Sequence, residues 1–190
     1  MQSKLMQEAC EKLKQDMLKS LNGTKVTSIE VGITDPQVAT YATYVERGWV
    51  QRVTPAQSLY FLNQGIPHPP KAGSSLVNPP RPFFSGTIAA RSADWKRLLE
   101  RFVKANGYKS LIQGLELVAL EAQSDIKDTV ASGRVRGGEA FEERSDLTMA
   151  LYAQETKGKK TDGTGSLSNR QPLNKTGTLF NSISWRFKER

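Results

Sequence analysis

Apolar residues recur every three or four positions in three stretches of the chain, which predicts three amphipathic helices. These stretches cover residues 3–21, 92–106 and 111–133, and each ends at or just before a glycine, as helices commonly do. In the third stretch, Leu117 and Leu120 widen the apolar stripe. We therefore expect this helix to be covered on more than one side, by a sheet, by another helix or by a neighbouring subunit.

Apolar and polar residues alternate in other stretches, which is typical of strands with one buried face. Residues 24–33 place Ile29, Val31 and Ile33 on one face, and Asp35 with Pro36 is expected to end this strand in a turn. We expect the strand to pair with a second one at residues 41–46.

The C-terminal residues 172–185 read as a capped turn, a short helix and a strand. Thr176 is the expected N-cap and Gly177 the bend, after which Ile183 and Trp185 alternate with polar residues. A further short helix is predicted from Thr54, as N-cap, through Leu62.

Two stretches show neither the helical spacing nor the alternation of strands, and we expect extended loops there, at about residues 66–84 and 133–172. The first contains six prolines, which exclude a helix interior and a central strand. The second is rich in glycine and polar residues, with one possible helical turn at residues 147–153. Together the patterns predict a single α+β domain over residues 1–190, with a small, mainly antiparallel sheet packed by several helices.

The composition narrows the class of protein. The 190 residues include 27 Lys and Arg against 19 Asp and Glu, and the formal charge of +8 favours polyanions or acidic protein surfaces as partners. The single cysteine, Cys10, excludes an intramolecular disulfide. No apolar run approaches bilayer length and the N-terminus lacks a signal-peptide pattern, so we expect neither membrane insertion nor secretion.

Candidate chemistry is sparse. The one histidine, His68, lies among prolines without a nucleophile motif or carboxylate companions, and residues 158–161 lack the glycine spacing of a phosphate loop. A carboxylate cluster is interpreted as a solvated charge run, with a divalent-metal site as the alternative; it comprises Glu139, Glu142, Glu143 and Asp146. We therefore predict no catalytic residue, cofactor or metal, and a protein that is not an enzyme.

The sequence offers several candidate residues for binding DNA or a partner protein. Basic side chains of the second loop could contact DNA phosphates or could simply keep an exposed loop soluble; they are Arg134, Arg136, Lys157, Lys159 and Lys160. The adjacent aromatic residues of Arg81-Pro82-Phe83-Phe84 either fill the domain's own core or anchor a partner. Trp49, next to a predicted turn, also suits an interface.

Three segments resemble motifs of the neck and tail-completion proteins of tailed bacteriophages, including the virion-morphogenesis group. They are residues 41–48 (YATYVERG), 81–84 (RPFF) and 172–183 (PLNKTGTLFNSI). That group often shows a tyrosine-rich strand ending in Glu-x-Gly, an Arg-Pro-Phe element leading into a helix, and a Pro-Leu-x-x-Thr-Gly-x-Leu-x-x-Ser-Ile run. In many relatives the Thr-Gly segment precedes the Glu-x-Gly strand, whereas here it is C-terminal.

The resemblance implies an α+β structural protein of the virion, located at the neck or the head-proximal end of the tail and in the host cytoplasm during assembly. It implies a homo-oligomeric ring, for which it favours a hexamer. The expected partners are the phage head connector and the tail tube or terminator proteins, with possible non-specific contact with packaged DNA and none with a membrane. A basic nucleic-acid-binding accessory protein is the alternative function.

Overall fold

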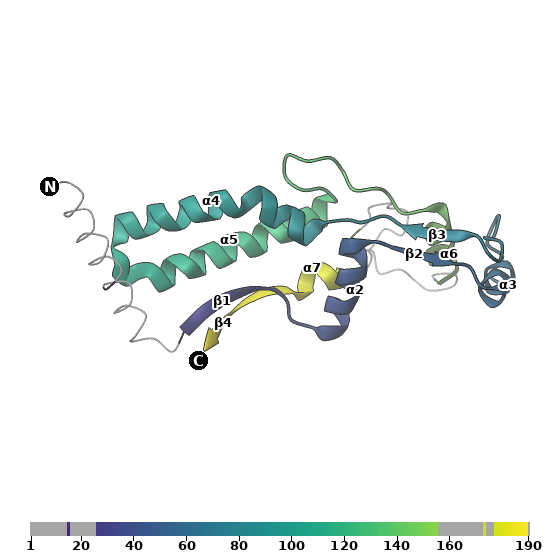
Figure 1. Ribbon diagram of the computed structural model, residues 1–190, viewed down its shortest axis with the longest axis horizontal. Helices are drawn as coiled ribbons and strands as arrows, with labels where there is room; N and C mark the ends of the chain where they lie inside the picture. Colours follow the sequence, from purple (N-terminus) through teal and green to yellow (C-terminus); the bar gives the residue numbers. More distant parts are fainter. Residues whose placement is uncertain (1–14, 16–25, 156–172, 174–176, 190) are drawn as a thin grey trace.

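The two longest helices form an antiparallel hairpin along one side of the molecule (Figure 1). The computed structural model describes residue 15, residues 26–155, residue 173 and residues 177–189, so the predicted helix at 3–21 lies outside the described residues except for Gln15. Helix α4 spans Phe83–Asn106 and α5 spans Leu111–Ser132, joined by a short 3-10 turn, η1 (Tyr108–Ser110). Both helices end where predicted, but α4 begins nine residues earlier than Ser92.

A two-stranded antiparallel ribbon packs against α5. Strand β1 (Val26–Ile33) pairs with β4 (Ile183–Glu189), with Val31 opposite Trp185 and Ile33 opposite Ile183. The two predicted strands are thereby confirmed, and they pair with each other from opposite ends of the chain. The short helix α7 (Thr178–Ser182) precedes β4 as predicted, but its N-cap is Gly177, and Thr176 lies outside the described residues.

The strand predicted at residues 41–46 is wrong, because these residues belong to helix α2 (Pro36–Arg47). Asp35 is its N-cap: one carboxylate oxygen accepts the backbone N–H groups of Gln37 at 2.8 Å and Val38 at 3.1 Å. The Asp-Pro pair thus begins a helix instead of a turn, with proline in the first turn, where a missing N–H costs nothing. Within α2, Ala42 and Val45 are buried three residues apart, on one helical face.

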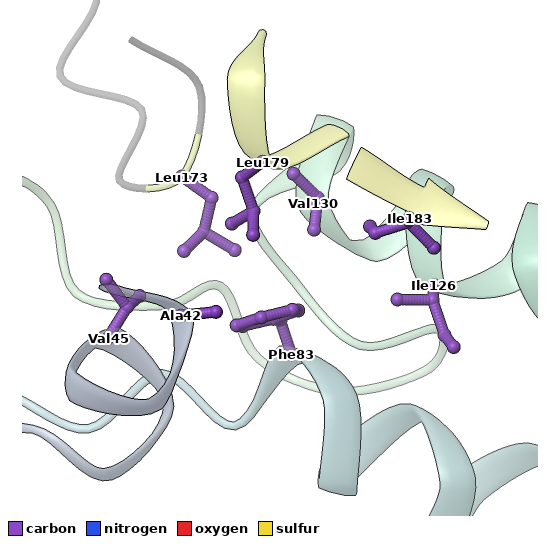
Figure 2. Close-up of a cluster of buried hydrophobic side chains, with 8 residues drawn as sticks. All are labelled: Ala42, Val45, Phe83, Ile126, Val130, Leu173, Leu179 and Ile183. Carbon is purple, nitrogen blue, oxygen red and sulfur yellow. The ribbon is translucent and has the colours of Figure 1, made fainter. Parts of the chain in front are cut away.

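The main hydrophobic core lies where α2, α7 and the start of β4 meet the ends of α4 and α5 (Figure 2). Its buried members are Ala42, Val45, Phe83, Ile126, Val130, Leu173, Leu179 and Ile183. Val130 and Ile183 are fully buried, and Phe83 and Ile126 are nearly so. The helical hairpin, α2 and the C-terminal segment are therefore held by one shared cluster of side chains.

A second, smaller cluster lies at the end of the molecule away from the α4–α5 turn (Figure 1). There, β2 (Trp49–Arg52) and β3 (Ser75–Asn78) form a second antiparallel pair, with α3 (Pro55–Asn63) between them in the chain and α6 (Asp146–Glu155) beside them. The buried residues Val53, Phe61 and Ile66 hold this part together. We call residues 49–78 the arm.

The structure of the arm can be compared with the short helix and the two loops predicted from the sequence. Helix α3 is confirmed, and it begins with a capping box in which Thr54 and Gln57 satisfy each other's backbone N–H groups. The loop predicted at 66–84 contains β3 and the first residues of α4, and the loop predicted at 133–172 contains α6. None of the six prolines lies within a helix or a strand, and β3 occupies proline-free residues between them. With two small antiparallel sheets packed by helices, the predicted α+β class is confirmed.

Candidate assembly interface

The three segments that carry the resemblance to phage proteins meet at one place in the structure. Residues 41–48 form the end of α2, residues 81–84 begin α4, and the described part of 172–183 supplies α7 and the start of β4. Each contributes to the main core, through Val45, Phe83 and Leu179 among others (Figure 2). We call this meeting point the motif junction.

Glu46 joins α2 to α4 at the motif junction. Pro82, at the N-cap position of α4, makes no capping hydrogen bond through its side chain. The Glu46 carboxylate takes that role from another helix, accepting the N–H groups of Phe84 at 3.0 Å and Ser85 at 2.9 Å and the Ser85 hydroxyl. A negative group at the positive end of the helix dipole also stabilises α4 electrostatically.

Gly48 allows the chain to pass very close to residues 78–80. Its backbone has φ of 68° and ψ of 175°, a region that only glycine occupies readily. A Cβ at this position would lie 2.6 Å from the Asn78 carbonyl oxygen and 2.7 Å from the Pro80 nitrogen. The Glu-x-Gly sequence therefore ends a helix here, and not a strand, with each of its two defining residues making a tertiary contact.

Arg81 is used inside the molecule. It is 4% exposed, and its guanidinium donates to the backbone carbonyls of Glu142 (3.1 Å) and Glu143 (3.4 Å) and to the side-chain oxygen of Asn78 (2.8 Å). Burial lowers the pKa of Arg81, and the nearby Glu142 charge opposes that shift. Arg81 thus ties the segment before α6 to the base of the arm.

The residues predicted as a partner interface therefore divide into two groups. Arg81 and Phe83 are buried, and Phe84 is partly buried against the main core, so this aromatic pair serves the domain's own packing. Pro82 and Trp49 are exposed, and Trp49 lies at the start of the arm.

The arm exposes an unusual amount of apolar surface. Of the twelve large hydrophobic side chains that are exposed among the described residues, six lie in the arm and two lie on the preceding helix, α2. The six are Trp49, Val50, Leu59, Tyr60, Leu62 and Val77, and the two are Tyr41 and Tyr44. Val50 and Val77 are direct cross-strand partners on the outer face of the β2–β3 pair. Concentrated exposed apolar surface of this kind marks an interaction site.

A groove runs along α3 on the same arm. It has a volume of about 610 Å³ and is lined by Pro55, Leu59, Leu62, His68, Pro69 and Lys71, among others. The one histidine of the chain thus lies at the wall of an apolar groove and is exposed. The sequence does carry a signal for this surface, because residues 47–93 contain no Asp or Glu.

The predicted DNA-contact residues are only partly within the described residues. Arg134 and Arg136 are exposed after α5, whereas Lys157, Lys159 and Lys160 lie outside the described residues. Arg136 lines a surface hollow together with Arg97 and Arg101 of α4, a proximity that the sequence did not indicate. Carboxylates interrupt this basic surface, since Asp94 pairs with both Arg91 and Arg97.

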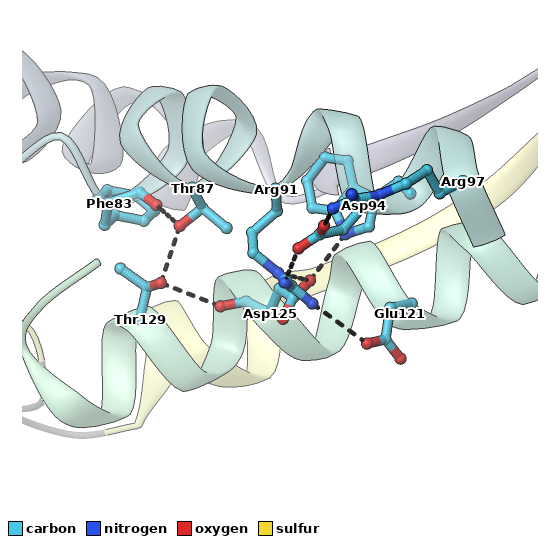
Figure 3. A network of polar contacts seen from close by, with 9 residues as sticks. Phe83, Thr87, Arg91, Asp94, Arg97, Glu121, Asp125 and Thr129 are labelled. Atoms are coloured by element: carbon cyan, nitrogen blue, oxygen red, sulfur yellow. Dashed lines mark hydrogen bonds and ion pairs between the residues drawn. The ribbon is translucent and has the colours of Figure 1, made fainter. Parts of the chain in front are cut away.

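A polar seam fixes α4 against α5 (Figure 3). The Asp125 carboxylate accepts from Arg91 Nε at 2.9 Å and Trp95 Nε1 at 2.7 Å, and the hydrogen bond to Asp125 raises the pKa of Arg91. One helical turn away, Thr87 of α4 and Thr129 of α5 form a hydrogen bond between their hydroxyls at 2.8 Å. These polar groups are hydrogen-bonded to one another. We therefore interpret the seam as fixing how α4 and α5 align, and not as a reaction site.

Other chemistry is limited in the part of the chain that the structure describes. No three His, Cys, Asp or Glu side chains there are grouped as a metal ion would require, which includes the carboxylates between Glu139 and Asp146. No described helix combines the length and the apolar character needed to cross a bilayer.

Comparison with known proteins adds no relative. Family models, curated proteins and solved structures were all searched, and none matches this chain.

Proposed function

We propose that the chain is a structural virion protein of a tailed bacteriophage, a tail-completion or neck protein at the head–tail junction. It forms an oligomeric ring that connects the tail to the head connector. The motif junction is the observation that supports this proposal most directly. Three segments that lie far apart in the sequence share one core. In addition, the Glu46 cap joins the first segment to the second, and Gly48 of the first segment lies close to the backbone of residues 78–80, just before the second.

The exposed arm supports the same proposal. A protein that works alone gains nothing from a surface with Trp49, Val50 and Leu59 exposed, whereas a ring subunit buries such a surface against its neighbours. The resemblance favours a hexamer, and it names the head connector and the tail tube or terminator proteins as neighbours in the particle.

Deletion of the gene in the phage or prophage that carries it tests this proposal. Electron micrographs of the resulting lysate should show full heads and tails that have not joined, and supplying the wild-type chain should restore complete particles. Normal yields of infectious, joined particles without the protein would contradict the proposal.

The alternative is a basic nucleic-acid-binding accessory protein. The observation in its favour is the approach of Arg136 to Arg97 and Arg101 at one hollow. Filter binding of duplex DNA across a salt series distinguishes the two functions. Tight binding by the monomer that weakens steeply with salt, and that Arg97→Ala with Arg136→Ala abolishes, would favour the alternative; weak binding unaffected by these changes would remove it.

A further inference from the structure

The centre of the molecule and the arm have separate hydrophobic cores. The main core joins α2, α7 and the start of β4 to the α4–α5 hairpin, whereas the arm's cluster is made by Val53, Phe61 and Ile66, with Leu76 and residues of α6 packed against it. No described residue belongs to both clusters. Apolar packing within each cluster therefore does not fix the angle between the arm and the centre.

Three stretches of the described chain connect the centre to the arm (Figure 1). The first leaves the end of α2 for β2, the second returns from β3 to α4, and the third runs from α5 to α6, beside the arm. Arg81 lies on the second stretch. Its backbone N–H donates to the Val45 carbonyl of α2 at 3.0 Å, which holds the backbone of Arg81 against the centre.

The side chain of Arg81 extends to the other two sides of this connection. Its guanidinium donates to the Asn78 side chain at the end of β3, and to the backbone carbonyls of Glu142 and Glu143 on the stretch that leads to α6. Arg81 therefore links the end of α2, the arm strand β3 and the stretch before α6 through one residue. Gly48 lies at the same place, because a Cβ there would meet the Asn78 carbonyl oxygen.

The bonds made by Arg81 are directional and involve a buried charge. All three acceptors are uncharged oxygens, and the side chain is buried, so the guanidinium depends on each of them to replace water. The next residue after these carbonyls, Arg144, is buried as well, and its guanidinium lies 5.2 Å from the centre of the Tyr152 ring of α6. Rotation of the arm would separate a buried cation from its acceptors, which apolar packing alone would not penalise in this way.

We propose that Arg81 positions the arm. Its buried guanidinium holds the arm and the centre at one fixed angle, and both parts stay folded but reorient when these bonds are lost. A subunit must present its contact surfaces at a constant angle if repeated contacts are to close a ring. That consequence rests on the proposed function, whereas the angle itself can be measured in the isolated chain.

Double electron–electron resonance between two spin labels measures the spread of this angle. Cys10 is the only cysteine, so the labels are attached to cysteines introduced in a Cys10→Ser background. The arm-to-centre pair is Asn63→Cys at the end of α3 with Ser92→Cys on α4, and both positions are exposed. Ser92→Cys with Ser124→Cys, an exposed position of α5, forms a reference pair within the centre. Dilution with unlabelled protein leaves only distances within one chain.

With Arg81 in place, both pairs should give one narrow distance. Arg81→Gln should lose the narrow arm-to-centre distance and give a broad distribution, while the reference pair stays narrow. Arg81→Lys should do the same, because an ammonium group keeps the charge but cannot bridge the three acceptors. Asp125→Ala is the matched control, since it removes polar contacts between α4 and α5 and none of those made by Arg81, and it should leave the arm-to-centre distance narrow.

Three results would overturn the inference. One is an arm-to-centre distance that stays narrow in both Arg81 variants. Another is a broad distance in the chain that retains Arg81, which would show that the arm is not held at one angle. The third is broadening of the reference pair in both variants, because Arg81 would then serve the folding of the whole chain. The deletion phenotype described above is a separate readout, so an arm that is held by other contacts and a failed virion function can be told apart.

Discussion

At the scale of single residues, Glu46 and Gly48 do more than end a helix. Glu46 supplies the N-terminal cap that α4 lacks from its own sequence, and Gly48 lets the chain leave α2 against the backbone of residues 78–80. Neither role could be predicted from the sequence, because each partner lies more than 25 positions away. Asp35, which caps its own helix two and three residues on, is the opposite case, and its role was open to prediction.

Replacing Glu46 by alanine should lower the free energy of unfolding by about 1–2 kcal/mol, the usual cost of a lost N-cap. The exposed carboxylate of Glu139 provides the control, and Glu139→Ala should change that free energy by less than about 0.5 kcal/mol. Urea unfolding followed by circular dichroism measures both. Equal stability of the two variants would contradict the capping role.

Comparing alanine substitutions at two glycines distinguishes the cost of a steric clash from the cost of backbone strain. Gly48 and Gly107 share nearly the same backbone conformation, but a Cβ on Gly107 would meet nothing within 4 Å. Gly107→Ala should therefore cost only the strain, about 1–3 kcal/mol, and Gly48→Ala should cost about 2 kcal/mol more because it strikes backbone atoms. Thermal denaturation of both variants is the measurement, and similar melting temperatures would refute the close approach at Gly48.

At the scale of elements, the sequence predicted the long helices and the β1 and β4 strands well, since each has a clear period and a stop such as Gly107 or Gly133. The prediction of a strand in place of α2 was wrong because the exposed Tyr41 and Tyr44 add apolar residues outside the buried face. Only Ala42 and Val45 show the helical spacing. The prediction was also wrong at the start of α4 because Pro82 and Gly86 are weak helix signals, and the cap that compensates comes from Glu46.

The polar seam should make a measurable contribution to the α4–α5 hairpin. Asp125→Ala removes the acceptor for Arg91 Nε and Trp95 Nε1 and leaves the mostly buried Arg91 guanidinium with Asp94 and Glu121 as its acidic partners. We expect a loss of about 2–3 kcal/mol in the free energy of unfolding. Asp128→Ala, at an exposed carboxylate of the same helix, is the control and should be nearly neutral. A similar small effect of both changes would show that the seam does not stabilise the hairpin.

The β1–β4 ribbon should respond to acid. Hydrogen bonds from Arg186 and Lys188 hold the pKa of Glu30 below its ordinary value. A carboxyl whose pKa is lower in the folded state stabilises the fold above its unfolded pKa, and this stabilisation is lost as pH falls through the folded pKa. The stability difference between wild type and Glu30→Gln should therefore be constant near neutral pH and vanish in acid. A difference that does not change with pH would contradict this pairing.

At the scale of the whole molecule, the chain has a well-packed centre and an arm that keeps much of its apolar surface exposed (Figure 1). The sequence indicated the arm's lack of acids but not its shape, since β2, α3 and β3 carry too short a pattern to show which residues face outward. Such a division suits a subunit whose centre folds alone and whose arm is completed by a neighbour.

The position of the protein in the particle tests the central claim most directly. A small tag on the chain, placed at an exposed and uncharged position outside the arm such as Gly137, can be labelled with gold in purified virions and located by electron microscopy. We predict that the label gathers at the junction between head and tail. Label found along the tail shaft or over the capsid, or particles that carry none, would contradict the proposal that this chain is a neck or tail-completion protein.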